Sequence, residues 1–213
     1  MNELATWTIA RRMEKTAKAL EKNGFKVETP KGVEALRALS LEMAREAQTV
    51  GFGGSVGVSE AGLPKLMAEA GKTCLIHSLP GLSPEERLAV MRRQLTCDLF
   101  ISGVNAVTLD GKVVNIDATG NRVSAMSFGP SKVLLVAGWN KISENLESAI
   151  ARIKALAAPP NAKRLALETP CAKTGFCADC DSPQRICRIV HIMEKRPRMT
   201  DITIALVDEN LGL

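Results

Sequence analysis

Residues 49–57 read Thr49-Val50-Gly51-Phe52-Gly53-Gly54-Ser55-Val56-Gly57. The first half is typical of a buried strand, and the glycines that follow predict a tight turn. Ser55 stands where a helix would begin and predicts its N-cap. A strand that turns directly into a helix is the repeating unit of an α/β fold.

The rest of the chain repeats this unit. Asn23-Gly24 predicts the end of a helix, and Ser83-Pro84 predicts the start of another. Ser182-Pro183 repeats that start signal. We therefore expect an α/β fold with a largely parallel sheet, flanking helices and one antiparallel hairpin. The expected helices cover residues 2–23, 32–47, 55–70 with a break near 62–64, 83–95, 143–157 and 184–195, and the expected strands cover 25–29, 49–53, 73–77, 98–102, 104–109, 112–117, 132–137 and 202–207.

Asp110-Gly111 predicts a two-residue hairpin turn. Such a turn pairs Val107 with Val114 and Asn105 with Ile116. Asn105 would then end an apolar face, where its amide needs a partner from the backbone or from a ligand.

The glycine turn is a candidate anion site. The bare amides of Gly53 and Gly54, with Ser55 and a helix N-terminus behind them, form a natural nest for a phosphate or a carboxylate, and Glu60 would lie one helical turn further on. No Walker lysine follows, and the dinucleotide fingerprint is incomplete. Arg122 is a second candidate anion ligand. The alternatives are a turn in which Ser55 only caps the helix, and a surface Arg122.

Composition limits the function. The chain has 213 residues, a net charge of +5, 46% hydrophobic residues and only 3% aromatic residues. Dispersed basic residues without stacking aromatics disfavour nucleic-acid binding and suit a small anionic ligand. No apolar run reaches the ~20 residues of a membrane span, and no signal sequence is evident, so we expect a cytoplasmic protein. The oligomeric state stays open.

Four of the six cysteines, Cys171, Cys177, Cys180 and Cys187, fall within 17 residues. In a reducing compartment, thiols this close favour a metal or redox role over disulfides. One close pair flanked by two more distant thiols suits an iron–sulfur cubane, 4Fe–4S, somewhat better than structural zinc, which prefers two close pairs. Free or redox-active thiols remain the third reading.

The remaining candidates have structural interpretations. Cys74 and Cys97 lie in or beside predicted strands, where cysteine usually serves as a small core residue. His77 and His191 have no nucleophile in a recognised arrangement beside them, so we interpret both as structural.

Several motifs, in this order, resemble the lactate-utilisation (LUD) domain family. They are Val50-Gly51-Phe52-Gly53-Gly54-Ser55, Glu60-Ala61-Gly62, residues 98–106, Asp110-Gly111-Lys112-Val113-Val114-Asn115-Ile116-Asp117, Gly120-Asn121-Arg122 and Gly138-Trp139-Asn140-Lys141-Ile142. The C-terminal cysteine segment resembles a subgroup of that family. The resemblance implies a fold like the sugar-phosphate isomerase and coenzyme A transferase superfamily, with the glycine turn facing the ligand. It implies no catalytic residue.

Pro159-Pro160 marks the expected domain boundary. We expect residues 1–158 to form the LUD-like α/β domain. Residues 159–213 would form a cysteine-rich segment whose helix and final strand pack on the same domain.

Three functional hypotheses follow. The first is an iron–sulfur protein that assists oxidation of a small organic acid such as lactate, or the associated electron transfer, with an oxidoreductase complex as partner. The second is a non-redox isomerase or acyl-transferase relative that uses Glu60 and carries structural zinc. The third is a subunit without catalysis of its own.

Overall fold

The computed structural model describes residues 2–213, and its centre is a six-stranded sheet in the order β1-β10-β7-β4-β2-β3. Every neighbouring pair in this sheet is parallel. The strands are β1 (Lys26–Glu28), β2 (Thr49–Phe52), β3 (Thr73–Ile76), β4 (Leu99–Gly103), β7 (Lys132–Gly138) and β10 (Asp201–Val207). The predicted fold class, α/β with a largely parallel sheet and flanking helices, is confirmed.

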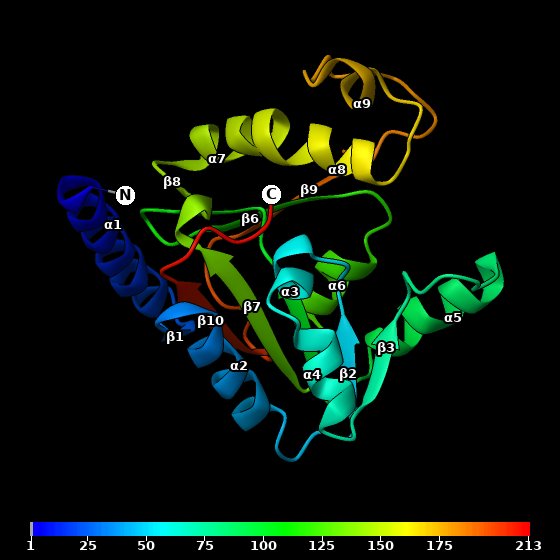
Figure 1. The fold of residues 1–213 in the computed structure, drawn as a ribbon, viewed down its shortest axis with the longest axis horizontal. Helices are drawn as coiled ribbons and strands as arrows, with labels where there is room; N and C mark the ends of the chain where they lie inside the picture. The colour runs from blue at the N-terminus through cyan, green and yellow to red at the C-terminus, as the bar shows by residue number, and fades with distance from the viewer. Residues whose placement is uncertain (1) are drawn as a thin grey trace.

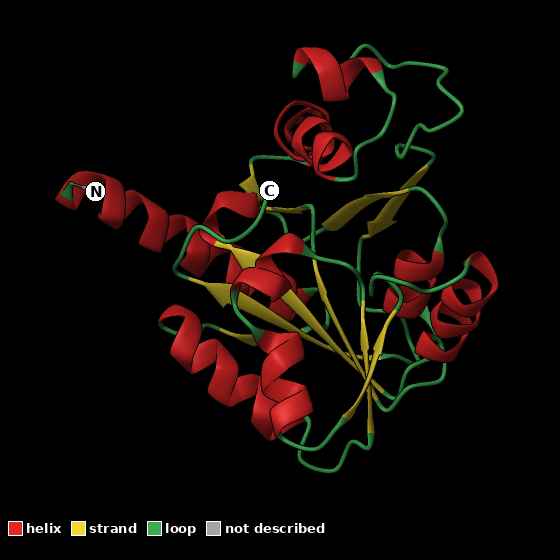
Figure 2. Cartoon of the chain, turned by 45° about the vertical axis from the view of Figure 1, so that its right-hand side comes forward, coloured by secondary structure: helices red, strands yellow, loops and turns green. Residues whose placement is uncertain are grey.

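Helices cover both faces of this sheet, as Figure 2 shows. They are α1 (Glu3–Lys22), α2 (Gly32–Met43), α3 (Val56–Glu60), α4 (Leu63–Glu69), α5 (Pro84–Gln94) and α6 (Asn121–Ser127). Side chains alternate along β7, so Val133 and Leu135 pack under α1, α5 and α6, while Leu134 packs under α2, α3 and α4. Burial on both faces explains the near-continuous apolar sequence of the central strands.

A second, smaller sheet lies beyond one end of the main sheet, in the order β8-β5-β6-β9. Its strands are β5 (Ala106–Thr108), β6 (Val113–Asp117), β8 (Ile142–Ser143) and β9 (Ile189–Met193). A helical segment packs on it and forms a third apolar cluster with Val114 and Ile116 (Figure 1). This segment runs through α7 (Leu146–Arg152), the π-helical turn η2 (Ile153–Ala157) and α8 (Ala158–Arg164). The expected domain boundary at residue 158 stays a prediction.

The hairpin register differs from the expected one by one residue. Val107 pairs with Val113, and Ala106 pairs with Val114. The amide of Thr108 donates to the carbonyl of Lys112, so the loop holds three residues, 109–111, and Gly111 adopts φ +81°. A three-residue loop that ends in a left-handed glycine is the second common hairpin form, and Asp-Gly is compatible with both.

The prediction of a helix over residues 184–195 was wrong. Ser182 and Arg185 form only a turn, and β9 then pairs with β6 in the antiparallel sense. The β-branched residues Ile189, Val190 and Ile192 favour a strand, and the free edge of β6 provides its partner. A long-range pairing therefore overrides the local serine–proline signal.

No helix among residues 2–213 combines the length and apolarity that crossing a membrane requires.

Leu135 tests the central packing of the sheet. Its side chain is fully buried on β7, so Leu135→Ala should lower the free energy of unfolding by about 2–5 kcal/mol through lost contacts and a cavity. Leu4→Ala, on an α1 side chain that is 76% exposed, is the control and should change it by less than about 0.5 kcal/mol. Urea denaturation monitored by circular dichroism measures the free energy of unfolding of both variants. Equal losses would contradict this account of the core.

Candidate functional site

A pocket lies where the parallel strands end. It has a volume of about 450 Å³, and it is lined by the glycine turn Gly53–Gly57 and Glu60 after β2, His77 after β3, Asn105 after β4 and Lys141 after β7. The chain passes from β2 to β3 on one side and returns to β4 on the other, so the strand order reverses beside β2. Open α/β sheets place ligands at the carboxyl ends of strands next to such a reversal.

Glycines let the backbone segments approach closely at this edge. β4 ends in Gly103 and β7 in Gly138, and Gly53 directly follows β2. A Cβ on Gly53 would collide with Ser102, one on Gly103 with Ser55, and one on Gly138 with the carbonyl of Glu209. None of these three glycines has a positive φ, so close approach, not backbone conformation, excludes a side chain there.

The glycine turn has the predicted form. Ser55 caps α3, because its hydroxyl accepts a hydrogen bond from the amide of Val58 at 3.4 Å. Gly53, Gly54, Ser55 and Glu60 all line the pocket. The carboxylate of Glu60 accepts a hydrogen bond from the amide of Gly212 at 2.8 Å, which joins α3 to the segment after β10. Whether these residues bind a ligand stays a prediction.

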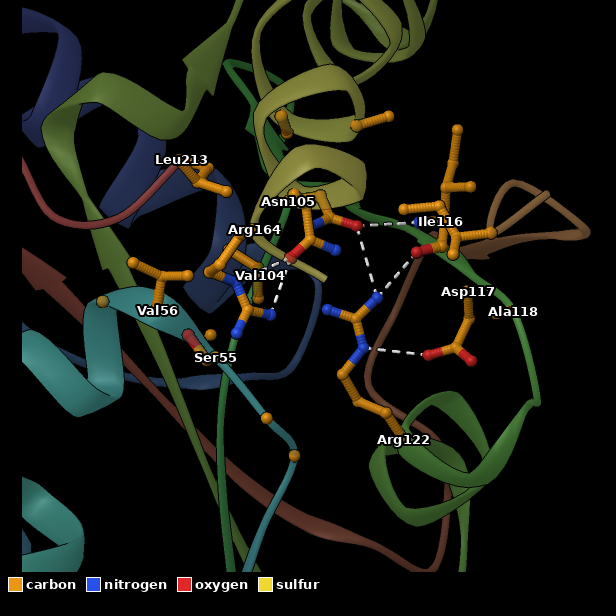
Figure 3. A pocket seen from close by; sticks show the side chains of 18 of the residues that line it. Ser55, Val56, Val104, Asn105, Ile116, Asp117, Ala118, Arg122, Arg164 and Leu213 are labelled. Atoms are coloured by element: carbon orange, nitrogen blue, oxygen red, sulfur yellow. Dashed lines mark hydrogen bonds and ion pairs between the residues drawn. The ribbon is translucent and has the colours of Figure 1, made fainter. Parts of the chain in front are cut away.

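Asn105, Asp117 and Arg122 form one hydrogen-bonded cluster at the pocket wall (Figure 3). Arg122 Nε lies 2.9 Å from Asp117 Oδ2, and its Nη2 donates to the carbonyl of Ile116 at 2.7 Å and to Asn105 Oδ1 at 3.3 Å. Asn105 Oδ1 also accepts from the amide of Ile116 at 2.9 Å. The amide of Asn105 therefore has backbone and side-chain partners, and most donors of Arg122 are engaged within the protein.

Asp117 is the electrostatic centre of this cluster. Its side chain is only 7% exposed, and burial alone would raise its pKa. The charge of Arg122 and the amides of Gly120 and Thr119 outweigh that effect, so the pKa of Asp117 is lowered. The carboxylate is thus held ionised beside the pocket.

Pattern reasoning missed three residues that line the pocket. Lys141 follows the end of β7, Arg164 lies at the end of α8, and Asn121 begins α6. Figure 3 shows Arg164 on the same side of the pocket as Ser55. Asn121 Nδ2 is buried and has no hydrogen-bond partner within residues 2–213. Two signals were available: Asn121 and Lys141 fall within motifs that carry the family resemblance, and Lys141 follows a buried strand whose carboxyl end faces the pocket.

Of the four clustered cysteines, only Cys187 lines this pocket. Cys171 is on α9 (Pro170–Thr174), Cys177 and Cys180 are on the following loop, and Cys187 comes just before β9. Cys187 lines the pocket and packs against the apolar cluster of the second sheet. Burial raises its pKa, and the charges of Cys177, Cys171 and Cys180 add to that rise.

These thiols do not form a preorganised metal-binding site in this structure. Within the described chain, no group of three or more histidine, cysteine, aspartate or glutamate side chains could hold a metal ion. All six cysteines are free, three of the clustered four are half-buried, and Cys177 is exposed.

The structural interpretation of the other two cysteines is confirmed. Cys97 is buried in the core, where burial raises its pKa to about 11, and Cys74 packs against the core on the opposite face of the sheet.

The two histidines differ in position. His77 lines the pocket and accepts a hydrogen bond from Gln94 Nε2 at 3.1 Å, and burial lowers its pKa. His191 is on β9, 2.7 Å from the hydroxyl of Ser127, and burial lowers its pKa too. Both are more readily neutral at pH 7 than an exposed histidine.

The chain has a three-layered α/β fold, with its pocket at the carboxyl edge of a parallel sheet. Many proteins share this arrangement, and comparison with known proteins identifies the family. The LUD domain profile matches residues 13–207, and this chain belongs to the LUD domain family. No curated protein matches the chain.

Two solved structures are similar. A DUF162 family protein from Deinococcus radiodurans has a TM-score of 0.55 and 13% identity, over 93% of this chain and 98% of that chain. At this identity the likeness concerns the fold alone. Ribose 5-phosphate isomerase from Plasmodium falciparum has a TM-score of 0.31 and 14% identity, over 54% of this chain and 55% of that chain. A TM-score this low supports no inference.

Asp117→Asn tests the buried cluster. At pH 7 the variant should lose about 3 kcal/mol of unfolding free energy, because Arg122 keeps its charge without its partner. Since folding lowers the pKa of Asp117, this stabilisation is complete above the ordinary aspartate pKa of about 4 and disappears as the pH falls through the folded value. The gap between wild type and variant should therefore narrow in acid.

Asp110→Asn is the matched control. Asp110 pairs with Lys112 but is 55% exposed, so its loss should cost less than about 1 kcal/mol. Denaturant titrations at pH 7, 5 and 3 measure all three proteins. A deficit of Asp117→Asn that stays constant over this range would refute the electrostatic explanation.

Proposed function

We propose that this LUD protein binds a 4Fe–4S cluster through Cys171, Cys177, Cys180 and Cys187. In that form it would assist the oxidation of a small organic acid such as lactate, or the associated electron transfer, with an oxidoreductase complex as partner. This assignment would place the chain in a cysteine-bearing subgroup of its family. One observation carries the proposal: Cys187 lines the same pocket as the glycine turn and Arg164.

The donor set supports the cluster. Four thiols within 17 residues match the ligand number of a cubane. A bound cluster supplies one-electron transfer at potentials that its surroundings tune.

Arg185 supports the segment that carries these thiols. Its guanidinium donates to the carbonyls of Cys180 and Cys187, each at 2.7 Å, and lies 2.7 Å from Asp179. It thereby ties two cysteine positions together and adds positive charge where thiolates would concentrate negative charge. Lys173 and Arg188 contribute less, because Lys173 pairs with Glu168 and Arg188 donates to the carbonyl of Pro183.

The pocket supports a carboxylate ligand. Glycine-turn amides at a helix start favour an anion. Arg164 bonds only to Asn161, at 2.8 Å and 3.1 Å, so its charge has no carboxylate partner in the described chain. The unpartnered Nδ2 of Asn121 is a further donor for a polar ligand. A volume of about 450 Å³ exceeds what lactate needs and falls within the range of ligand pockets.

Metal analysis of anaerobically purified protein tests the cluster. We expect about four iron and four sulfide per chain, a brown colour, and loss of both in Cys180→Ser. Cys74→Ser is the matched control, because Cys74 lies on β3, away from the segment, and should leave the iron content unchanged.

Three results would redirect the interpretation. Stoichiometric zinc without sulfide would favour the structural-zinc alternative and a non-redox enzyme. Metal-free protein with reactive thiols would exclude the cluster. If the protein contains iron but is active only when an oxidoreductase co-purifies with it, an accessory subunit would be favoured.

Titration calorimetry with lactate tests the anion pocket. Arg164→Gln should weaken binding about tenfold, since a charge-assisted hydrogen bond contributes about 1.5–3 kcal/mol. Lys163→Gln, on an exposed neighbour outside the pocket, is the control for net charge. If both variants weaken binding equally, the net positive charge of the protein attracts the anion, and Arg164 does not bind it in the pocket.

A further inference from the structure

Lys141 is an unusual lysine. It ends the 3₁₀ turn η1 (Trp139–Lys141), is 5% exposed and lines the pocket. Lysine is almost never this buried unless it is paired. In residues 2–213, no carboxylate lies within ion-pair distance of its Nζ, and no hydrogen bond engages that atom.

Its surroundings disfavour the charged amine. Burial and the nearby charge of Arg152 lower the pKa of Lys141 to about 7, whereas Glu60 acts in the opposite direction. Arg152 donates to the carbonyls of Asn140 and Asn105 at 2.8 Å and 3.0 Å, so its position is determined by the backbone. A large fraction of Lys141 is therefore neutral, with a free lone pair, at ordinary pH.

The amine shares its pocket with groups that suit a carboxylate. Nζ lies beside the segment after β10, since a Cβ on Gly212 would be 3.7 Å from it. The glycine turn, Ser55 and Arg164 line the same pocket. A small molecule with a carboxylate next to a carbonyl group could thus meet anion donors and a neutral amine together. A desolvated lysine beside another cation is a recognised way to activate an amine nucleophile.

We propose that Lys141 is a nucleophile that forms a reversible imine with a small 2-oxo acid in this pocket. The Nζ lone pair forms a bond to the carbonyl carbon. The carbon–oxygen bond then breaks, and the oxygen leaves as water with both protons of the amine. Hydrolysis reverses the step, so no oxidant or reductant is consumed. The inference rests on the organic-acid pocket of the proposed function but requires no metal at the cysteines.

Reductive trapping tests this activity. The full-length chain is incubated with pyruvate and cyanoborohydride, and the adduct is located by intact mass and peptide mapping. We expect one adduct per chain, on Lys141, formed at least tenfold faster with pyruvate than with acetone, which lacks the carboxylate. The labelling rate should rise as the pH passes through about 7, because only the neutral amine attacks.

Three variants control the experiment. Lys141→Arg, which keeps a long basic side chain without a neutral amine, and Lys141→Met should both lose the adduct, while Lys163→Met on the exposed end of α8 should keep it. Labelling spread over surface lysines, or an unlabelled Lys141 in the wild type, would overturn the inference whether or not the variants fold. Iron measured on the same sample separates the two proposals. An adduct on metal-free protein supports the imine alone, and an iron-loaded protein without an adduct removes the imine alone.

Discussion

The parallel alignment of β2, β4, β7 and β10 is the constraint on which the site depends. Because all four strands run in one direction, the segments that follow them emerge at the same edge of the sheet. Glycine at or just after the ends of β2, β4 and β7 lets these segments touch, and the reversal of strand order beside β2 opens the pocket between them. The helices on both faces bury the sheet and leave this edge as the place where polar groups collect.

The second sheet and the helical segment above it give the pocket its other wall. Ile153 and Ala157, which begin and end the π-helical turn η2, both line the pocket, and π-helical turns are frequent at functional sites. The Asp117–Arg122 pair joins β6 to α6, and the amide of Arg188 donates to the carbonyl of Asp117. A short chain of contacts thus connects the cysteine segment to the buried ion pair.

Local sequence features predict much of this arrangement. Apolar runs of strand length identify the buried strands of the main sheet, although β1 (Lys-Val-Glu) has none, and Ser55 and Ser83 mark helix starts where the structure has them. The sequence-based predictions that fail concern features that depend on residues far away in the sequence. Asp110-Gly111 is compatible with two loop lengths, and only the packed sheet selects the three-residue form. β9 exists because β6 offers a free edge, and the lowered pKa of Lys141 arises from burial, which spacing along the chain does not encode.

The last strand, β10, lies between β1 and β7 and not at an edge of the sheet. During synthesis, β1 therefore has no neighbour in the sheet until residues 201–207 have been made. The early part of the chain must wait with an exposed apolar surface, and closure requires contacts between residues about 175 positions apart, which slows folding. The parallel sheet is therefore completed only by a pairing between segments far apart in the sequence.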